Sequence, residues 1–256
     1  MIRGLYTAAS GMMLQMQRQD VVANNIANAN SSGYKKDTAI SQAFPDMLIS
    51  RGGETNPRRA GKAMSPVPIG PLGTGAVVAE IATDFSAGKI QMTENSTDLA
   101  INSQGFFAVL TPAGERFTRD GACKINAQGL LVTSDGYYVL DRNNQAIPFR
   151  SDYLVDEDGR VWDENNQWRA QLKVVEFDDP RYLRKEGGLM NSAGQGYVLL
   201  DNPGIKQGYL ELSNVNAIQE MVNLINVVRA YESCQKVIQA EDEITGIAIN
   251  QVGSIS

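Results

Sequence analysis

The sequence contains no histidine, so the usual general base and the commonest metal ligand are both missing. Its two cysteines, Cys123 and Cys234, match no metal-ligand spacing, and we expect both to be small buried side chains. Two carboxylates would suffice for a glycosidase, but no pair among the 29 acidic residues stands out. We therefore predict a chain with no catalytic residue, no cofactor and no metal site.

Long apolar runs and basic stripes are also missing. No stretch of 18 apolar residues is present, which argues against insertion into a membrane. The net charge of −6 leaves no basic surface to displace counterions from phosphates, which argues against nucleic-acid binding. Polar residues interrupt the N-terminal segment at Gln15 and at 17–20, so we expect no cleaved signal peptide.

Apolar residues recur at three- and four-residue steps at both ends of the chain, which predicts two long helices. The first helix is expected over Tyr6 to Asn30, with Gly33 ending it in a left-handed conformation. The second is expected from Ala217 to about Asn250, capped by Asn216. The repeating residues are Leu5, Ala9, Met12, Met13, Met16, Ala23 and Ile26, and then Ile218, Met221, Val222, Ile225, Val228, Tyr231, Val237, Ile238, Ile244 and Ala248.

These helices cannot bury their apolar stripes alone, which indicates a subunit built for assembly. Residues 1–36 carry four basic residues and one acidic residue, whereas residues 214–256 carry two basic and five acidic residues. Opposite charge favours pairing of the two ends as a coiled-coil-like layer, within one chain or between chains. An ordinary helical hairpin that closes a globular domain is the alternative.

Between the helices, short alternating runs separated by turn residues predict an antiparallel all-β domain. The expected strands are 105–110, 116–118, 130–133, 137–140 and 172–177, and the expected hairpin turns are Asp120-Gly121, Gln128-Gly129, Asp135-Gly136, Asn143-Asn144 and Asp158-Gly159. The fold class is therefore α+β. We divide the chain into an N-terminal helix at 1–34, a linker at 35–76, a β-domain at 77–213 and a C-terminal helix at 214–256.

The linker is weakly patterned. Its second half, Gly52 to Gly75, is dense in glycine and proline and predicts an extended arm, with a flexible loop as the alternative.

Several segments, in order along the chain, resemble the bacterial flagellar rod and hook axial proteins. The N-terminal segments are 5–12, 23–30 and Gly33-Tyr34-Lys35. The central segments are 85–90, 93–95, 98–101, 105–107 and 117–121, and the C-terminal segments are 208–216 and 229–232.

This resemblance implies a structural subunit of the tubular flagellar axis in the basal body, outside the cytoplasmic membrane. Such subunits are exported unfolded through the flagellar type III apparatus, and they polymerise with copies of themselves and next to other rod and hook proteins. Their terminal helices form the innermost layer of the tube. The segments 34–75 and 225–232 resemble the distal-rod member, which we favour over a proximal-rod or hook-basal-body protein.

Two other classes of function stay open: a wall-acting glycosidase, and a surface adhesin whose β-domain binds a ligand. A deep pocket with paired carboxylates would favour the glycosidase, and helices that stabilise a single subunit would favour the adhesin.

The candidate assembly interface combines the stripes with the motifs. The expected residues are Leu5, Met12, Met16, Asn24, Asn25, Ile26, Asn28, Ser213, Asn214, Val215, Ile218, Met221, Ile225, Val228, Arg229, Tyr231, Glu232, Ile238 and Ile244. The asparagines are expected to donate and accept hydrogen bonds across helix contacts, where a purely apolar face would promote early aggregation.

Overall fold

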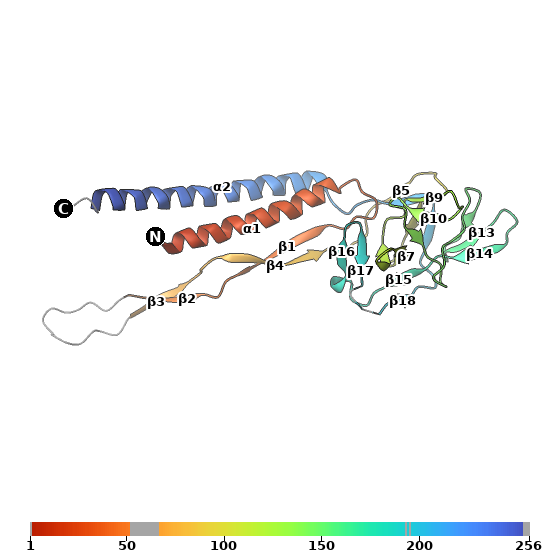
Figure 1. The fold of residues 1–256 in the computed structure, drawn as a ribbon, viewed down its shortest axis with the longest axis horizontal. Coiled ribbons are helices and arrows are strands. Elements are labelled where there is room, and N and C mark those ends of the chain that lie inside the picture. The colour runs from red at the N-terminus through yellow and green to blue at the C-terminus, as the bar shows by residue number, and fades with distance from the viewer. Residues whose placement is uncertain (1, 52–66, 193, 195, 253–256) are drawn as a thin grey trace. The chain divides into compact units, whose positions relative to one another are not determined.

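The computed structural model describes residues 2–51, 67–192, 194 and 196–252, whose elements are labelled in Figure 1. The chain forms two compact units. Unit 1 takes its described residues from 1–23, 38–82 and 219–256. Unit 2 takes its described residues from 24–37 and 83–218. Each unit therefore combines segments that lie far apart in the sequence.

Unit 1 holds most of the two long helices, α1 (Ile2–Ala27) and α2 (Ala217–Ile247), and a π-helical turn η2 (Ala248–Val252) that follows α2. Both predicted helices are confirmed, although the first begins at Ile2 and ends at Ala27, where Tyr6 and Asn30 were expected. Asn216 Oδ1 accepts a 3.1 Å hydrogen bond from the Ile218 N–H, which confirms the predicted cap. Gly33 has a φ of 64°, the left-handed conformation that was expected after the first helix.

The two helices lie side by side in opposite directions, and small residues of α1 form the contact (Figure 1). A Cβ atom added to Gly11 would lie 3.1 Å from Cys234 Sγ, and one added to Gly4 would lie 2.6 Å from Glu241 Oε1. Glycine therefore allows the close approach of the helices. The contact uses the face of α1 that carries Gly4, Ala8 and Gly11, and not the predicted apolar stripe.

A two-stranded ribbon completes unit 1. Strand β1 (Asp37–Ala43) pairs with β4 (Ala76–Thr83), and β2 (Met47–Arg51) pairs antiparallel with β3 (Val67–Leu72). Strand β3 contains two prolines, which a ribbon tolerates because only one edge of each strand needs its N–H groups. Of the predicted arm from Gly52 to Gly75, residues 52–66 lie outside the described part of the chain.

Unit 2 is an antiparallel β-domain, as predicted. Its main sheet has nine strands, in the order β16-β17-β8-β7-β11-β10-β9, with β15 pairing both β7 and β18. A three-stranded sheet, β12-β13-β14, and two pairs, β19-β6 and β20-β5, complete it. The bounds are β5 Ile90–Met92, β6 Leu99–Ile101, β7 Phe106–Thr111, β8 Gly114–Thr118, β9 Cys123–Ile125, β10 Leu131–Thr133, β11 Tyr138–Val139, β12 Leu154–Val155, β13 Arg160–Trp162, β14 Trp168–Gln171, β15 Val174–Glu176, β16 Arg184–Glu186, β17 Leu189–Asn191, β18 Val198–Leu199, β19 Ile205–Gln207 and β20 Tyr209–Glu211, with a 3-10 helix η1 at Pro180–Tyr182.

Two apolar clusters fill unit 2, one on each face of the central strand β7. Alternate residues of β7 point to opposite faces, so Phe107 and Val109 join one cluster while Phe106 and Ala108 join the other. In the second cluster Phe106 and Phe117 both meet Phe177 edge to face, with ring centroids 5.8 and 5.0 Å apart. The sheet is thus covered on both faces around β7.

Four of the five predicted turns contain a residue with positive φ: Gly129, Gly136, Asn144 and Gly159. The prediction of a hairpin turn at Asp120-Gly121 is wrong, because β8 and β9 on either side of it are not neighbours in the sheet. A Cβ atom on Gly121 would lie only 1.6 Å from the Leu99 carbonyl oxygen. Glycine is required here for close backbone packing and not for a tight turn.

Candidate assembly interface

Helix α1 turns large apolar side chains toward solvent. Leu5, Met13 and Met16 lie on one face of the helix and are 39 to 63% exposed. The opposite face holds the buried residues Leu14 and Val21. We call the three exposed side chains the α1 stripe.

Helix α2 presents a second exposed row, formed by Ile218, Met221, Val222 and Ile225, and we call it the α2 stripe. Their spacing of three and four residues places them on one face, and they are 47 to 76% exposed. Completing the burial of an apolar side chain that is half exposed stabilises an assembly by about 1 kcal/mol. Each α2 stripe therefore offers about 4 kcal/mol to a partner surface.

The other predicted residues of α2 divide between two environments. Arg229 and Glu232 continue the face of the α2 stripe and are exposed, and Ile244 is exposed as well. Val228, Tyr231 and Ile238 are half-buried. Half-buried predicted residues elsewhere in the chain are Met12, Ile26, Ser213, Asn214 and Val215.

The structure places Asn25 inside unit 2, which differs from its expected place at a contact between subunits. Its Nδ2 donates to the Asp37 carbonyl at 2.8 Å, and its Oδ1 accepts from the Asp37 N–H at 3.0 Å and from the Tyr34 hydroxyl at 3.2 Å. Asn25 is completely buried. The Asn25 amide therefore fixes the chain after α1. It binds both the N–H and the carbonyl of Asp37, as the backbone of a neighbouring strand would.

Asn24 and Asn28 shape the end of α1. The Asn28 Nδ2 donates to the Asn24 carbonyl at 2.9 Å, and its Oδ1 accepts from the Ser31 hydroxyl at 3.2 Å. These bonds satisfy groups that the last helical turn leaves open. Asn24 itself is exposed.

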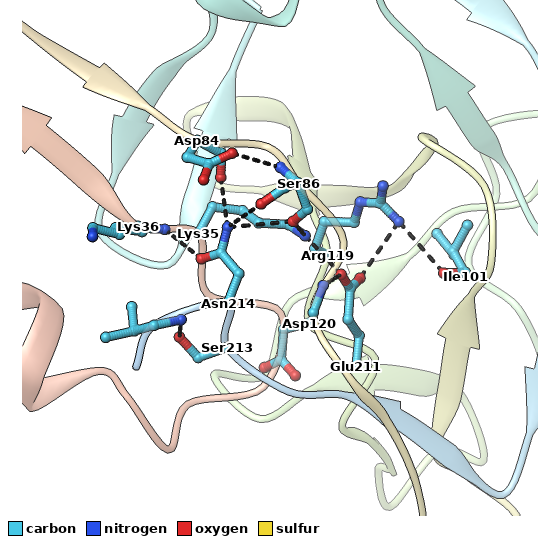
Figure 2. Close-up of polar contacts among 12 residues, drawn as sticks. Lys35, Lys36, Asp84, Ser86, Ile101, Arg119, Asp120, Glu211, Ser213 and Asn214 are labelled. Atoms are coloured by element: carbon cyan, nitrogen blue, oxygen red, sulfur yellow. Dashed lines mark hydrogen bonds and ion pairs between the residues drawn. The ribbon is translucent and has the colours of Figure 1, made fainter. Parts of the chain in front are cut away.

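A buried cluster of three charged residues, Lys35, Arg119 and Glu211, lies in unit 2 (Figure 2). Lys35 Nζ forms an ion pair of 2.6 Å with Glu211 Oε1 and donates a 2.8 Å hydrogen bond to the Ser86 carbonyl. A backbone hydrogen bond links the same two segments, since the Gly33 N–H donates to the Glu211 backbone carbonyl at 2.8 Å. We call these three charged residues the junction cluster.

Arg119 shares the single carboxylate of the junction cluster. Its Nη1 lies 3.4 Å from Glu211 Oε2 and donates to the Ile101 carbonyl at 3.5 Å, while its guanidinium stands 5.3 Å from the centre of the Phe106 ring. The Gly88 N–H adds a 2.8 Å hydrogen bond to Glu211 Oε1. Two buried cations therefore depend on one carboxylate.

Burial changes the acidity of both cations. It is the largest influence on Lys35 and lowers its pKa below the ordinary 10.5, against the opposing effect of the Glu211 hydrogen bond. Burial also lowers the pKa of Arg119. Within the described chain, Arg119 Nε has no hydrogen-bond partner. The junction cluster thus holds its charges at an electrostatic cost.

Asn214 binds the segment just before β1 and the segment just after β4, beside the junction cluster (Figure 2). Its Oδ1 accepts from the Lys36 N–H at 2.8 Å, and its Nδ2 donates to the Asp84 carbonyl at 2.9 Å and to Ser86 Oγ at 3.1 Å. Ser213 Oγ accepts from the Val215 N–H at 3.2 Å. Asn214, expected at the assembly interface, has its side-chain amide engaged inside the subunit.

Sequence reasoning missed the junction cluster as a site, although all three charged residues fall inside the quoted motifs. Lys35 ends Gly33-Tyr34-Lys35, while Arg119 and Glu211 lie within 117–121 and 208–216. The available signal is that each of these three motifs contains a charged residue. Which charges meet depends on contacts across as many as 176 positions.

Both cysteines are free. Cys123 is buried, and burial raises the pKa of its thiol, whereas Cys234 is half-buried in the seam between the helices. Within the described residues, neither helix is both long and apolar enough to cross a membrane.

Three family models match the chain, in order from its N-terminus. They are "Flagella basal body rod protein" at residues 5–35, "Flagellar hook protein FlgE/F/G D1 domain" at 100–162 and "Flagellar basal body rod FlgEFG protein C-terminal" at 206–251. All three describe proteins of the flagellar rod or hook.

Curated relatives match along almost the whole chain. The flagellar basal-body rod protein FlgG of Borreliella burgdorferi is 37% identical over 98% of both chains. The flagellar hook-basal body complex protein FlhO of Bacillus subtilis is 34% identical over both full lengths, and the rod protein FlgF of Caulobacter vibrioides is 33% identical over both full lengths. The chain belongs to the flagellar basal-body rod protein family. It is a structural subunit of the rod.

Proposed function

We propose that the chain polymerises through α1 and α2 into the innermost layer of a tubular drive shaft that transmits torque to the hook. The observation that carries this proposal is the exposure of the α1 and α2 stripes. A monomer that kept both rows in water would forgo several kcal/mol of apolar burial. Repeated contacts of this kind that do not close produce an open helical filament.

Charge supports contacts between the two helices of different copies. The excess of basic residues in 1–36 meets an excess of acidic residues in 214–256. Within one chain, the small-residue face of α1 already occupies one side of α2. The coiled-coil-like layer would then form between copies, through the exposed members of the predicted interface.

We place the subunit in the distal rod, on the resemblance of segments 34–75 and 225–232 to the distal member. The alternative is a proximal-rod or hook-basal-body protein of the same family. In this proposal the segments 1–34 and 214–256 form the inner layer, 35–76 links them to the β-domain at 77–213, and export proceeds through the flagellar type III apparatus without a cleaved signal peptide.

We also propose that the subunit has no catalytic role. A cavity of about 450 Å³ in unit 2 includes Asp120 and Asp135 in its lining, and a glycosidase would need two such carboxyls at a set separation across the scissile bond. Asp120 Oδ1, however, accepts a 3.0 Å hydrogen bond from the Ala122 N–H, so this carboxylate has a structural task in the chain. Membership in a structural family favours the rod over an enzyme or an adhesin.

The test places a charge in the α2 stripe. Ile225→Asp should abolish polymer formation and swimming, because burying an unpaired carboxylate at a helix contact costs several kcal/mol. Leu110→Asp adds the same charge to a comparably exposed residue of the β-domain, 45% against 52% for Ile225, and should assemble normally. Ile225→Leu retains an apolar side chain and should swim.

The measurements are electron microscopy of basal bodies, motility, and thermal melting of unit 2 in each variant. Unit 2 should melt as in the parent chain in all three. Normal rods from Ile225→Asp would refute the role of the α2 stripe. Loss of rods from Leu110→Asp as well would show that the effect is not specific to the helix.

A further inference from the structure

Both tryptophans of the chain lie next to each other in the three-stranded sheet of unit 2. Trp162 of β13 is the register partner of Trp168 in β14 and of Leu154 in β12. The register of β13 and β14 shifts between Val161 and Trp162, so that Val161 pairs with Ala170 on one side of the shift and Trp162 with Trp168 on the other. Val161 and Ala170 are buried, whereas Leu154 and Trp168 are exposed. We call Leu154, Trp162 and Trp168 the tryptophan patch.

The tryptophan patch faces solvent, and a hydrogen bond holds one of its two indole rings in place. Leu154 is 65% exposed and Trp168 is 56% exposed. Trp162 is half-buried, and its indole N–H donates a 3.0 Å hydrogen bond to Asp156 Oδ2, which fixes the ring. Large side chains whose conformation is fixed before binding lose little entropy when a partner covers them, and tryptophan is enriched among residues that dominate binding energy.

Two carboxyl groups face each other at the rim of the tryptophan patch. Asp152 and Glu164 lie two residues beyond the register pair Leu154 and Trp162, on the same end of the sheet. Proximity to Asp152 is the largest influence on Glu164 and raises its pKa, against the opposing effect of the positive charge of Arg150. Two exposed acidic side chains at one rim of the patch attract a cation.

The charged residues around the tryptophan patch favour a basic partner. Residues 150–169 contain six acidic and three basic residues, a net charge of −3. Two of the three arginines are already paired, Arg160 with Asp158 at 3.3 Å and Arg169 with Asp163 at 2.6 Å. This rim repels acidic polymers and attracts a basic surface.

We propose that the tryptophan patch is a docking site for a basic protein segment, in which a lysine or arginine lies beside an apolar side chain. The cation binds at the rim that carries Asp152 and Glu164, and the apolar side chain packs on Trp168 and Leu154. The site lies outside the terminal helices. It is therefore independent of the helix contacts that build the polymer.

Tryptophan fluorescence tests the proposal on the purified full chain, because the patch contains both tryptophans. The probe is a short synthetic peptide of alternating lysine and leucine, compared with peptides of glutamate and leucine and of lysine and serine. The lysine-leucine peptide should shift the emission to shorter wavelength and bind most tightly, with an affinity that falls as salt increases.

Variants of the patch make the test specific. Trp168→Ala should raise the Kd by roughly 30-fold or more, with Trp162 as the remaining reporter. Joint replacement Asp152→Asn and Glu164→Gln should raise it about 5-fold. Asp178→Asn removes one exposed charge elsewhere in unit 2 and should leave the Kd unchanged. Leu154→Ser supplies a second patch variant if Trp168→Ala melts at a lower temperature than the parent chain.

A photo-crosslinking residue at position 168 then identifies the partner in assembled basal bodies. The expected product joins position 168 to a segment of another protein that carries lysine or arginine next to an apolar residue. Equal binding of the acidic peptide, or an unchanged Kd in both patch variants, would overturn the proposal. A crosslink to a second copy of this chain would overturn it as well.

Discussion

Replacing Lys35 by Met should destabilise unit 2 by about 3 kcal/mol, the lower end of the cost of breaking a buried ion pair. The substitution removes the 2.6 Å ion pair and the 2.8 Å bond to the Ser86 carbonyl. Glu211 still accepts from the Gly88 N–H and keeps Arg119 at 3.4 Å, which limits the loss.

Glu211→Gln should cost more, about 5 kcal/mol, because it removes the one carboxylate that Lys35 and Arg119 both contact and leaves two buried cations close together. Glu211→Gln should therefore be the more destabilising of the two variants, because it leaves two cations of the junction cluster unpaired, whereas Lys35→Met leaves one cation with the carboxylate. Lys206→Met makes the same chemical change at an exposed lysine of β19 and should alter stability by less than about 0.5 kcal/mol.

Urea unfolding of the purified chain, followed by tryptophan fluorescence, measures these changes in unit 2, since Trp162 and Trp168 both lie there. The midpoint should fall in the order Lys206→Met, Lys35→Met, Glu211→Gln. A midpoint for Lys35→Met equal to that of the control would show that this ion pair contributes nothing. The reverse order of the two cluster variants would refute the charge argument.

Three further outcomes are expected. Asn25→Ala should lower the free energy of unfolding of unit 2 by about 1–3 kcal/mol, since it leaves buried backbone groups unpaired, whereas Asn24→Ala at an exposed position should change it little in the same urea assay. Gly121→Ala should prevent folding of unit 2 because its Cβ would overlap a backbone carbonyl at 1.6 Å, while Gly188→Ala, with open space around it, should give a native circular dichroism spectrum. Because burial lowers the pKa of Lys35 in the folded chain, the unfolded chain binds more protons just below pH 10.5; stability should therefore rise with pH toward 10.5, and Lys35→Met should reduce that rise in urea titrations.

The periodic parts of the fold could be predicted from the sequence. Three- and four-residue steps located both helices, and alternating runs located the strands β7, β8, β10, β11 and β15. The ribbon in 35–76 was not predicted as strands, because Pro68 and Pro71 in β3 argue against a central strand. Only the pairing with β2 shows that these prolines lie in a two-stranded ribbon, where one edge stays free.

The candidate assembly interface also contains residues that the sequence could predict and residues that it could not. The stripes depend on local spacing, so Ile218, Met221 and Ile225 were found together on one exposed face. An asparagine amide can bind the backbone of its own subunit or a neighbouring subunit. The local sequence around Asn25 and Asn214 does not show which of the two it does. Their roles follow from long-range contacts, which spacing does not encode.

The junction cluster joins residues 176 positions apart, and this separation governs how unit 2 folds. Strands β6 and β5 near the start of the domain pair with β19 and β20 at its end. Contacts between such distant residues form slowly, because a large loop must close before they stabilise the chain. A chain that emerged gradually from a narrow passage, N-terminus first, would lack partners for Lys35, β5 and β6 until almost all of it had appeared. The domain would therefore close late, and nearly all at once.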